Sequence, residues 1–340
     1  MNLTIIRRLV QITAFIVFVY GIGLGGYYLA DKFSSSLPAL ACAYDMYTAD
    51  HCALISLQHQ MDHRAAPVLA SGGSLIDAFL PTLITMGTFG LLLVILSKAF
   101  CGWICPLGFF QEVMNIIGQK LGFKQTESLG RETVKKTRPI KWLMVIFLLF
   151  IFPLLTGFGL TGHEFGDPFC RICPSRILTT LATGDPKELV VDTSTTGYFI
   201  FSVIATFLFG LMMSIGLMVR QPFCRICPML ALNTLFKKIG LVRLVKEAKP
   251  RCVKCGLCAK ACPMDIHEIH TDMVNKDVIY PDCTLCGRCV EFCPDKDVLK
   301  LKYAFLPILS ADPAYFKKRK KAQRQWEKIT FFNTQNKGNK

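Results

Sequence analysis

The chain has 340 residues, of which 52% are hydrophobic, and its formal net charge is +15. A soluble basic protein is rarely so apolar, so the charged and apolar residues must be segregated along the chain. The positions of the charges, given below, exclude nucleic-acid binding as the reason for the basic character.

Four stretches of about twenty residues contain no charged side chain, and each is long enough to cross a hydrocarbon core of about 30 Å. They are Leu9–Ala30, Ala78–Ser97, Trp142–Thr161 and Gly197–Val219. The first has a basic start, as a secretory signal does. Its apolar run, however, exceeds the core of about 7–15 residues of such a signal, and no clear cleavage site follows. We therefore predict an α-helical membrane protein with four transmembrane helices, the first of them uncleaved.

The basic residues between these stretches predict the orientation. Two, eight and twenty-four Lys and Arg lie in one set of alternate segments, and two and three lie in the other. Cytoplasmic segments of membrane proteins carry the excess of Lys and Arg. We therefore expect a multi-pass protein of the bacterial inner membrane with both termini in the cytoplasm, and with residues 31–77 and 162–196 on the periplasmic side.

A pair of cysteines follows each predicted span, on alternate faces of the membrane. The pairs are Cys42 and Cys52, Cys101 and Cys105, Cys170 and Cys173, and Cys224 and Cys227. The heptapeptide P-F-C-R-I-C-P occurs at 168–174 and again at 222–228, and C-G-W-I-C-P occurs at 101–106. Proline after the second Cys suits the first turn of a helix, whose N-terminal amides favour a negatively charged, thiolate-bound group. The bundle thus consists of two duplicated hairpins.

The last third of the chain carries the pattern C-x2-C-x2-C-x3-C-P twice, at 252–263 and 283–294. Bacterial ferredoxins hold two [4Fe–4S] clusters with this spacing, and each motif gives its fourth Cys to the other cluster. We assign one cluster to Cys252, Cys255, Cys258 and Cys293, and the other to Cys283, Cys286, Cys289 and Cys262. Zinc also binds C-x2-C pairs, but it requires neither the third Cys nor the Cys-Pro ending.

The remaining cysteines form two more sets of four, and we predict that each set binds a [4Fe–4S] cluster that joins the two hairpins. The inner set is Cys101, Cys105, Cys224 and Cys227; the outer set is Cys42, Cys52, Cys170 and Cys173. Two alternatives stay open: structural zinc at the inner set, and a Cys42–Cys52 disulfide in an oxidising compartment.

These assignments divide the chain into three parts. A transmembrane domain covers 1–245, a C-terminal α+β ferredoxin domain covers 246–302, and a basic tail covers 303–340. A basic tail with aromatic residues is suited to anionic lipid or to a cytoplasmic partner.

The spans, the Cys-Pro motifs and the double ferredoxin motif resemble a family of membrane polyferredoxins. Its members include NapH of periplasmic nitrate reduction, the C-terminal part of NosR from nitrous oxide respiration, and CcoG of oxidase assembly. The resemblance covers about residues 75–295, and C-G-W-I-C-P-L-G at 101–108 is its most specific carrier outside the ferredoxin motifs. It supplies no counterpart for Cys42 and Cys52.

The resemblance implies a respiratory electron-transfer subunit, and the cysteine count adds the expectation of four [4Fe–4S] clusters. Its expected partners are a cytoplasmic electron donor or the quinone pool on one side, and a periplasmic cytochrome, reductase or flavoprotein on the other. Two alternatives stay open: a quinol dehydrogenase subunit like NapH, and a metal-reducing assembly factor like CcoG. His51 and His163 are candidate hydrogen-bond partners for a quinone, with ordinary loop histidines as the alternative. No histidine lies within a predicted span, so the sequence does not predict a haem b.

Overall fold

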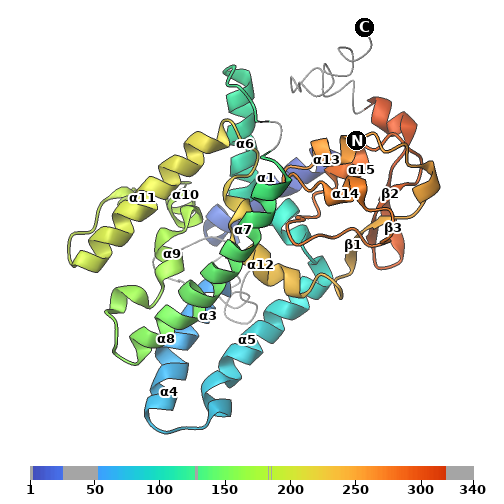
Figure 1. Ribbon diagram of the computed structural model, residues 1–340. Coiled ribbons are helices and arrows are strands. Elements are labelled where there is room, and N and C mark those ends of the chain that lie inside the picture. The colour runs from blue at the N-terminus through green and yellow to red at the C-terminus, as the bar shows by residue number, and fades with distance from the viewer. Residues whose placement is uncertain (1–2, 26–52, 127–128, 183, 185, 319–340) are drawn as a thin grey trace.

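The computed structural model describes residues 3–25, 53–126, 129–182, 184 and 186–318. It consists of a helical bundle and a smaller part that contains all three strands of the described residues (Figure 1). The long helices are α1 (Leu3–Gly25), α5 (Leu75–Leu96), α7 (Arg131–Met144), which continues through the π-helical η4 (Val145–Ile151) into α8 (Phe152–Gly157), and α11 (Thr196–Gly216).

Three helical stretches of the described residues are long and apolar enough to cross a membrane: Leu75–Leu96, Glu132–Gly157 and Thr196–Gly216. They correspond to the second, third and fourth predicted spans. The third begins ten residues, or nearly three helical turns, before the predicted start at Trp142. Arg138 and Lys141, which bind the ferredoxin part, lie in this additional helical segment. The first predicted span overlaps α1, but residues 26–30 lie outside the described residues.

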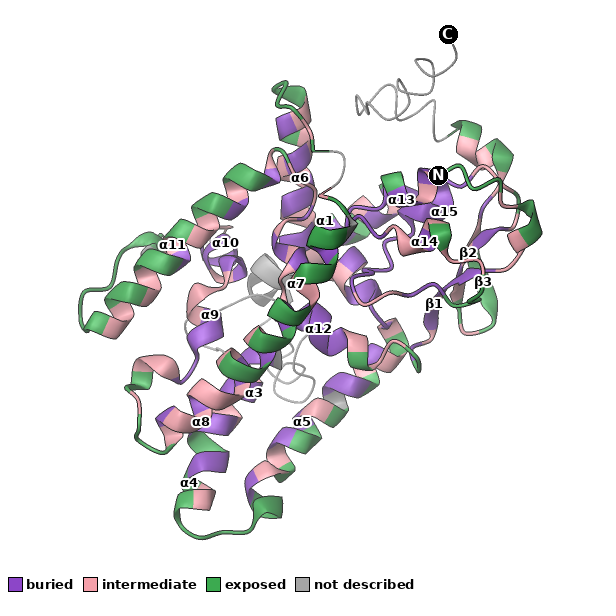
Figure 2. Ribbon diagram, in the orientation of Figure 1, coloured by how far each residue is buried: buried purple, intermediate pink, exposed green. Residues whose placement is uncertain are grey.

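Large apolar side chains are exposed along these three stretches, as expected of helices that face lipid. Leu83 is 65% exposed on α5, and Phe207 is 66% exposed on α11. Figure 2 shows exposed residues along α5, α7 and α11, whereas buried residues gather where the bundle meets the ferredoxin part. The exposed apolar faces and the length of the helices together suggest a membrane protein.

Shorter helices contain or follow the cysteine pairs, and they pack into the bundle. They are α3 (Ala53–Gln60), the π-helical η2 (Met61–Ala65) and α4 (Ala66–Ala70), then α6 (Pro106–Lys120), α9 (Pro168–Ile172), α10 (Pro174–Ala182) and α12 (Pro228–Leu235). Short helical turns complete the connections: η3 (Phe100–Ile104), η5 (His163–Phe165), η6 (Lys187–Leu189), η7 (Phe223–Arg225) and η8 (Lys249–Arg251). The predicted proline at the first helical position is confirmed at Pro106, Pro174 and Pro228.

Residues 53–70 differ from the expected periplasmic connection, because they are continuously helical and enter the core. Leu54, Leu57 and Met61 are at most 2% exposed, and their spacing puts them on one face of a helix. Leu54 and Leu57 pack in the same buried cluster as Phe89 and Leu149 of the long helices. Asp62, His63 and Arg64 interrupt the hydropathy of this segment, which is why it does not look like a bundle helix in the sequence.

The ferredoxin part is built on an antiparallel sheet in the order β1-β2-β3. Its elements are β1 (Val242–Lys246), α13 (Leu257–Ala261), α14 (Glu268–Thr271), α15 (Arg288–Glu291), β2 (Leu299–Tyr303) and β3 (Leu306–Ser310). Val242 pairs with Tyr303 and Lys246 with Leu299, so the strands before and after the two cysteine motifs join into one sheet. The sheet therefore extends beyond residues 246–302 on both sides.

The ferredoxin part shares its hydrophobic core with the bundle. Ala99 and Leu230 of the bundle lie in one buried cluster with Cys262, Cys283 and Leu285. The chain's first helix also reaches across: the backbone N–H of Thr4 donates to Glu291 Oε1 at 2.8 Å. The two parts therefore meet through buried residues on both sides.

Candidate iron–sulfur sites

The structure brings together each of the two predicted ferredoxin sets. Burial raises the pKa of the Cys262 thiol, and the nearby Cys286 and Cys283 thiols raise it further. Burial likewise raises the pKa of Cys293 to about 12, although a backbone hydrogen bond at Asp295 opposes the shift. The thiols that raise this pKa further are those of Cys258 and Cys255. Each fourth cysteine thus lies beside the other motif, in the crossed arrangement that the sequence predicts.

The two motifs form the same loop in the backbone. Lys254 and Leu285, each two residues after the first Cys, have φ values of 53° and 50°. Gly256 and Gly287, two residues further on, have φ values of 74° and 76° and cap α13 and α15. Positive φ at two positions of each loop curls the chain around the thiols, and Gly adopts it without steric cost. In the second loop the N–H of Leu285 points at Cys283 Sγ, 3.4 Å away.

The inner set also comes together, from two distant parts of the bundle. Burial raises the pKa of the Cys101 thiol well above its usual range, and the thiols of Cys105, Cys227 and Cys224 raise it further. Burial raises the pKa of Cys227 to about 12, although the N–H groups of Leu230 and Met229 in α12 oppose the shift. Those amides confirm the prediction that a helix N-terminus faces a thiol of this set.

Cys170 and Cys173 line the same cavity as the four inner cysteines. Leu54, Phe169, Phe223 and Leu230 contribute to its apolar wall. The sequence predicts the third pair at the membrane face opposite to the inner set, and in the structure these six cysteines line one cavity. Cys42 and Cys52 lie outside the described residues.

Thiols brought together in three sets of four, most of them at least partly buried and some with amides aimed at sulfur, fit [4Fe–4S] clusters. A thiolate-bound cluster is negatively charged, and N–H groups that point at its ligands favour that charge. Six thiols line one cavity whose other described lining residues are mainly apolar, so sulfur is the main type of ligand that it offers to a metal group. Clusters at these cysteines remain the prediction made from their pattern in the sequence.

Two glutamines make the same contacts at two of the cysteine pairs. Gln58 accepts a hydrogen bond from the N–H of Phe169 at 3.1 Å, and its amide Nε2 lies 3.1 Å from Cys170 Sγ. Gln111 accepts from the N–H of Phe223 at 2.9 Å, and its Nε2 lies 3.5 Å from Cys224 Sγ. Each glutamine thus holds the backbone before a cysteine and donates toward the sulfur.

The sequence contains a signal for these glutamines. The pattern C-x-L-x3-Q occurs at 52–58 and again at 105–111. Leu54 and Leu107 are equivalent, because each accepts from the amide of its own glutamine. Sequence reasoning missed this repeat because it concentrated on the cysteines. The repeat indicates that Cys52 corresponds to Cys105. The spacing of the cysteines alone does not indicate this correspondence.

Gly102 joins the inner set to the ferredoxin part. A Cβ atom at this position would lie 2.3 Å from the carbonyl oxygen of Thr284, which is in the second cysteine loop. Beside it, Trp103 Nε1 donates to the carbonyl of Leu285 at 3.0 Å. The loop that carries Cys101 and the loop that carries Cys283 and Cys286 are therefore in direct contact.

Buried ion pairs fasten the contact. The Glu112 carboxylate binds Arg7 at 2.6 Å, with Arg8 and Arg288 each 3.6 Å away. Burial alone would raise the pKa of Glu112, but the charges of Arg7, Arg288 and Arg8 outweigh it and lower the pKa to about 2.

Further ion pairs start beside the ferredoxin cysteines. Asp282, next to Cys283, accepts from Arg138 and Lys141 of α7 at 2.6 and 2.5 Å. Asp265, three residues after Cys262, accepts from Arg225 at 2.8 Å. Asp282 and Asp265, which lie near cysteines of the second ferredoxin set, thus bind that side of the ferredoxin part to the bundle.

A "4Fe-4S binding domain" family matches residues 78–124, and a "4Fe-4S dicluster domain" family matches residues 244–294. The ferredoxin-type protein NapH of Escherichia coli is 24% identical over 263 residues, which are 76% of this chain and 74% of NapH. Together, these matches support a polyferredoxin family. These matches point to iron–sulfur electron transfer.

Other relatives of the chain match over a shorter length. An uncharacterized protein of Methanocaldococcus jannaschii is 30% identical over 176 residues, which are 52% of this chain and 62% of that protein. The putative electron transport protein YccM of E. coli is 28% identical over 196 residues, which are 57% of this chain and 49% of YccM. The chain therefore spans less than two thirds of the length of these two relatives. No solved structure matches the chain.

Proposed function

We propose that the polyferredoxin is a membrane-bound electron-transfer subunit with four [4Fe–4S] clusters. It would relay electrons between a cytoplasmic donor or the quinone pool and a periplasmic redox partner. Both termini would lie in the cytoplasm of a bacterial cell, because the basic segments predict that orientation.

The observation that carries the proposal is the unbroken succession of thiol sets. Cys258 of the first ferredoxin set is an electrostatic neighbour of Cys289 in the second. The second set adjoins the inner set through Gly102, and the inner set shares its cavity with Cys170 and Cys173. Electron tunnelling falls steeply with distance, so a relay requires that no two neighbouring sites lie a bilayer apart.

The chain's own residues would hold and adjust these clusters. The first ferredoxin set is Cys252, Cys255, Cys258 and Cys293, and the second is Cys262, Cys283, Cys286 and Cys289. The inner set is Cys101, Cys105, Cys224 and Cys227, and the outer set is Cys42, Cys52, Cys170 and Cys173. A bound [4Fe–4S] cluster supplies one-electron chemistry, at a potential set by charge, hydrogen bonds to sulfur and solvent exposure. Gln58 and Gln111 would donate to ligand sulfurs, and the apolar wall of the cavity would exclude water.

The first ferredoxin set is suited to meeting a soluble partner. Cys255 is exposed, and Val253 beside it is 68% exposed. The second set is buried: Cys262, Cys283, Cys286 and Cys289 are each less than 10% exposed. Electrons would therefore enter or leave the ferredoxin part at the loop Cys252–Cys258, and pass to the bundle at the other set.

Iron and acid-labile sulfide analysis tests the number of clusters. We expect about sixteen irons per chain, from four clusters of four irons each. About eight irons, with Cys42 and Cys52 in a disulfide, would contradict both bundle clusters. A value near twelve would contradict the outer cluster alone.

Redox titration of the protein in membranes then tests the direction. Reduction of the clusters by a quinol analogue favours the quinone pool as donor, and the NapH-like alternative. Reduction by a low-potential cytoplasmic donor alone favours outward transfer from the cytoplasm. Reduction by neither would contradict the proposed relay.

A further inference from the structure

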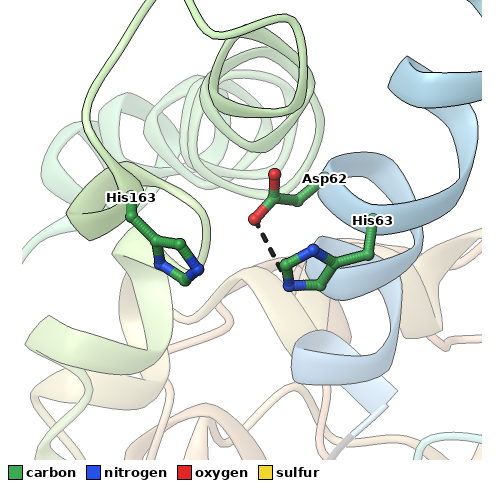
Figure 3. Close-up of side chains that lie close together, drawn as sticks. All are labelled: Asp62, His63 and His163. Atoms are coloured by element: carbon green, nitrogen blue, oxygen red, sulfur yellow. Dashed lines mark ion pairs between the residues drawn. The ribbon is translucent and has the colours of Figure 1, made fainter.

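A second group of metal-ligating side chains lies apart from the cysteines. Asp62 and His63 of η2 and His163 of η5 each offer a ligand atom, and these atoms lie within 4.8 Å of one another. Figure 3 shows the two imidazoles and the carboxylate turned toward a common space, with the Asp62 Oδ2 to His63 Nε2 ion pair of 3.6 Å drawn as a dashed line. The ligands come from segments about 100 residues apart in the sequence.

The carboxylate of this group is held firmly by the fold. Asp62 is 5% exposed, and two glycines make room for it. A Cβ at Gly166 would lie 2.4 Å from Asp62 Oδ2, and a Cβ at Gly157 would lie 2.3 Å from the Asp62 carbonyl oxygen. A buried carboxylate is stable when it is paired or binds a metal. The position of Asp62 is therefore fixed before any ligand arrives.

The imidazoles of His63 and His163, in contrast, are exposed to solvent. The His63 side chain is 55% exposed, and its ring centroid lies 5.9 Å from that of His163. His59 lies one turn earlier in the same continuous helix, with its ring centroid 5.6 Å from that of His63. Two histidines four residues apart on a helix is the spacing of known metal-binding helices. His59 is thus placed as an additional ligand.

We propose that Asp62, His63 and His163, with His59 beside them, bind one divalent transition-metal ion such as Zn²⁺ or Cu²⁺. Imidazole nitrogen with a single carboxylate suits these ions, whereas Mg²⁺ and Ca²⁺ prefer oxygen ligands. Zn–N bonds are about 2.0–2.1 Å long, so the two exposed imidazoles would rotate inward on binding.

The site lies next to the cysteine pair that is furthest from the ferredoxin part along the thiol succession. Gln58, which contacts Cys170, precedes Asp62 by four residues of continuous helix, or about 6 Å along its axis. Metal binding at this place is separate from electron transfer, and it can be measured without any redox partner.

Zn²⁺ titration of the intact protein in detergent tests the inference. The clusters are kept assembled under anaerobic conditions, so that their thiolates do not compete for the metal. We expect one Zn²⁺ per chain beyond the cluster iron. Asp62→Asn and His63→Gln should each weaken binding at least about tenfold, since the loss of even a supporting group around a metal costs about 10–100-fold. His267→Gln in the ferredoxin part is the matched control and should leave binding unchanged.

Cu²⁺ binding provides a second readout. The EPR spectrum of the bound ion should show nitrogen hyperfine splitting, which His63→Gln should alter. The cluster absorbance of each variant shows whether it has folded. Absence of stoichiometric binding, or equal affinity in Asp62→Asn, His63→Gln and the control, would overturn the proposal.

Discussion

The ferredoxin part and the bundle build four-thiol sites in opposite ways. In the ferredoxin part, three thiols of each set lie within seven residues, and two positive φ values curl the loop around them. In the bundle, the inner set draws its two pairs from segments more than one hundred residues apart. A ferredoxin site thus depends mainly on local backbone, whereas a bundle site exists only when the helices have packed.

The largest effect should come from removing one bundle pair. In a Cys224→Ala/Cys227→Ala variant we expect the loss of about four irons per chain and separation of the two hairpins, because half of the inner set is gone. Iron analysis and EPR should show the ferredoxin signals retained. If those signals disappear as well, the two regions are not independent in the way described above.

The ion pairs at Glu112 should contribute next most. Glu112→Gln leaves Arg7 buried without its charged partner, and breaking such a pair costs about 3–5 kcal/mol. We expect the ferredoxin part to become more sensitive to protease while its clusters remain. Glu132→Gln, at an exposed position, should change stability by no more than about 0.5 kcal/mol. Equal behaviour of the two variants would contradict a docking role for Glu112.

Gly102→Ala tests the contact between the two regions. The added methyl group would meet the carbonyl of Thr284, and overpacking of this kind costs about 1–3 kcal/mol. Reduction of the bundle clusters should slow relative to that of the ferredoxin clusters in stopped-flow measurements. Gly87→Ala is the control, because a Cβ there meets no atom within 4 Å. Unchanged kinetics in both would argue against transfer through this joint.

Gln111→Leu should lower the reduction potential of the inner cluster. The amide N–H favours the more negative, reduced cluster, so its loss disfavours reduction. A hydrogen bond of about 1 kcal/mol corresponds to a shift of about 40 mV for one electron. EPR redox titration should show this shift in one signal, and Gln58→Leu should move a different signal. A purely structural role would change cluster content without this selective shift.

The smallest effect concerns the pH dependence of the sheet. A hydrogen bond from Lys302, with further ones from Lys300 and Lys276, lowers the pKa of Glu247 to about 2. Burial alone would raise this pKa. The pKa of a free Glu is about 4.3, so this stabilisation is present above that value and is lost as the pH falls toward 2. Glu247→Gln should cost about 0.5 kcal/mol at neutral pH, and less as the pH approaches 2. Thermal unfolding of the variant at several pH values measures the difference, and a constant difference would contradict the assignment.

The sequence predicted the parts of this molecule that local pattern determines. The lengths of the apolar stretches predicted three long helices. The cysteine spacing predicted that the fourth cysteine of each ferredoxin motif lies beside the other motif. It did not predict that residues 53–70 enter the core. The charge of Asp62 lowers the mean hydropathy of this segment, so the apolar face of its helix is not apparent from that average. Nor did it predict the shared cavity. Counting the Lys and Arg residues in alternate segments assigns each loop to a membrane face, but it does not indicate how deeply a loop packs into the bundle.

The contact between Thr4 and Glu291 has a consequence for biosynthesis. The two residues are 287 positions apart, so α1 must leave the ribosome long before its partner is made. Throughout that interval the Arg7–Glu112 ion pair lacks Arg288, which also lies within 3.6 Å of Glu112 in the folded chain. The nascent chain therefore needs its early helices held, by the insertion machinery or by one another, until the last sixth has been translated and has acquired its iron. Folding of the C-terminal part would then be the step that completes the packing of α1 against the rest of the protein.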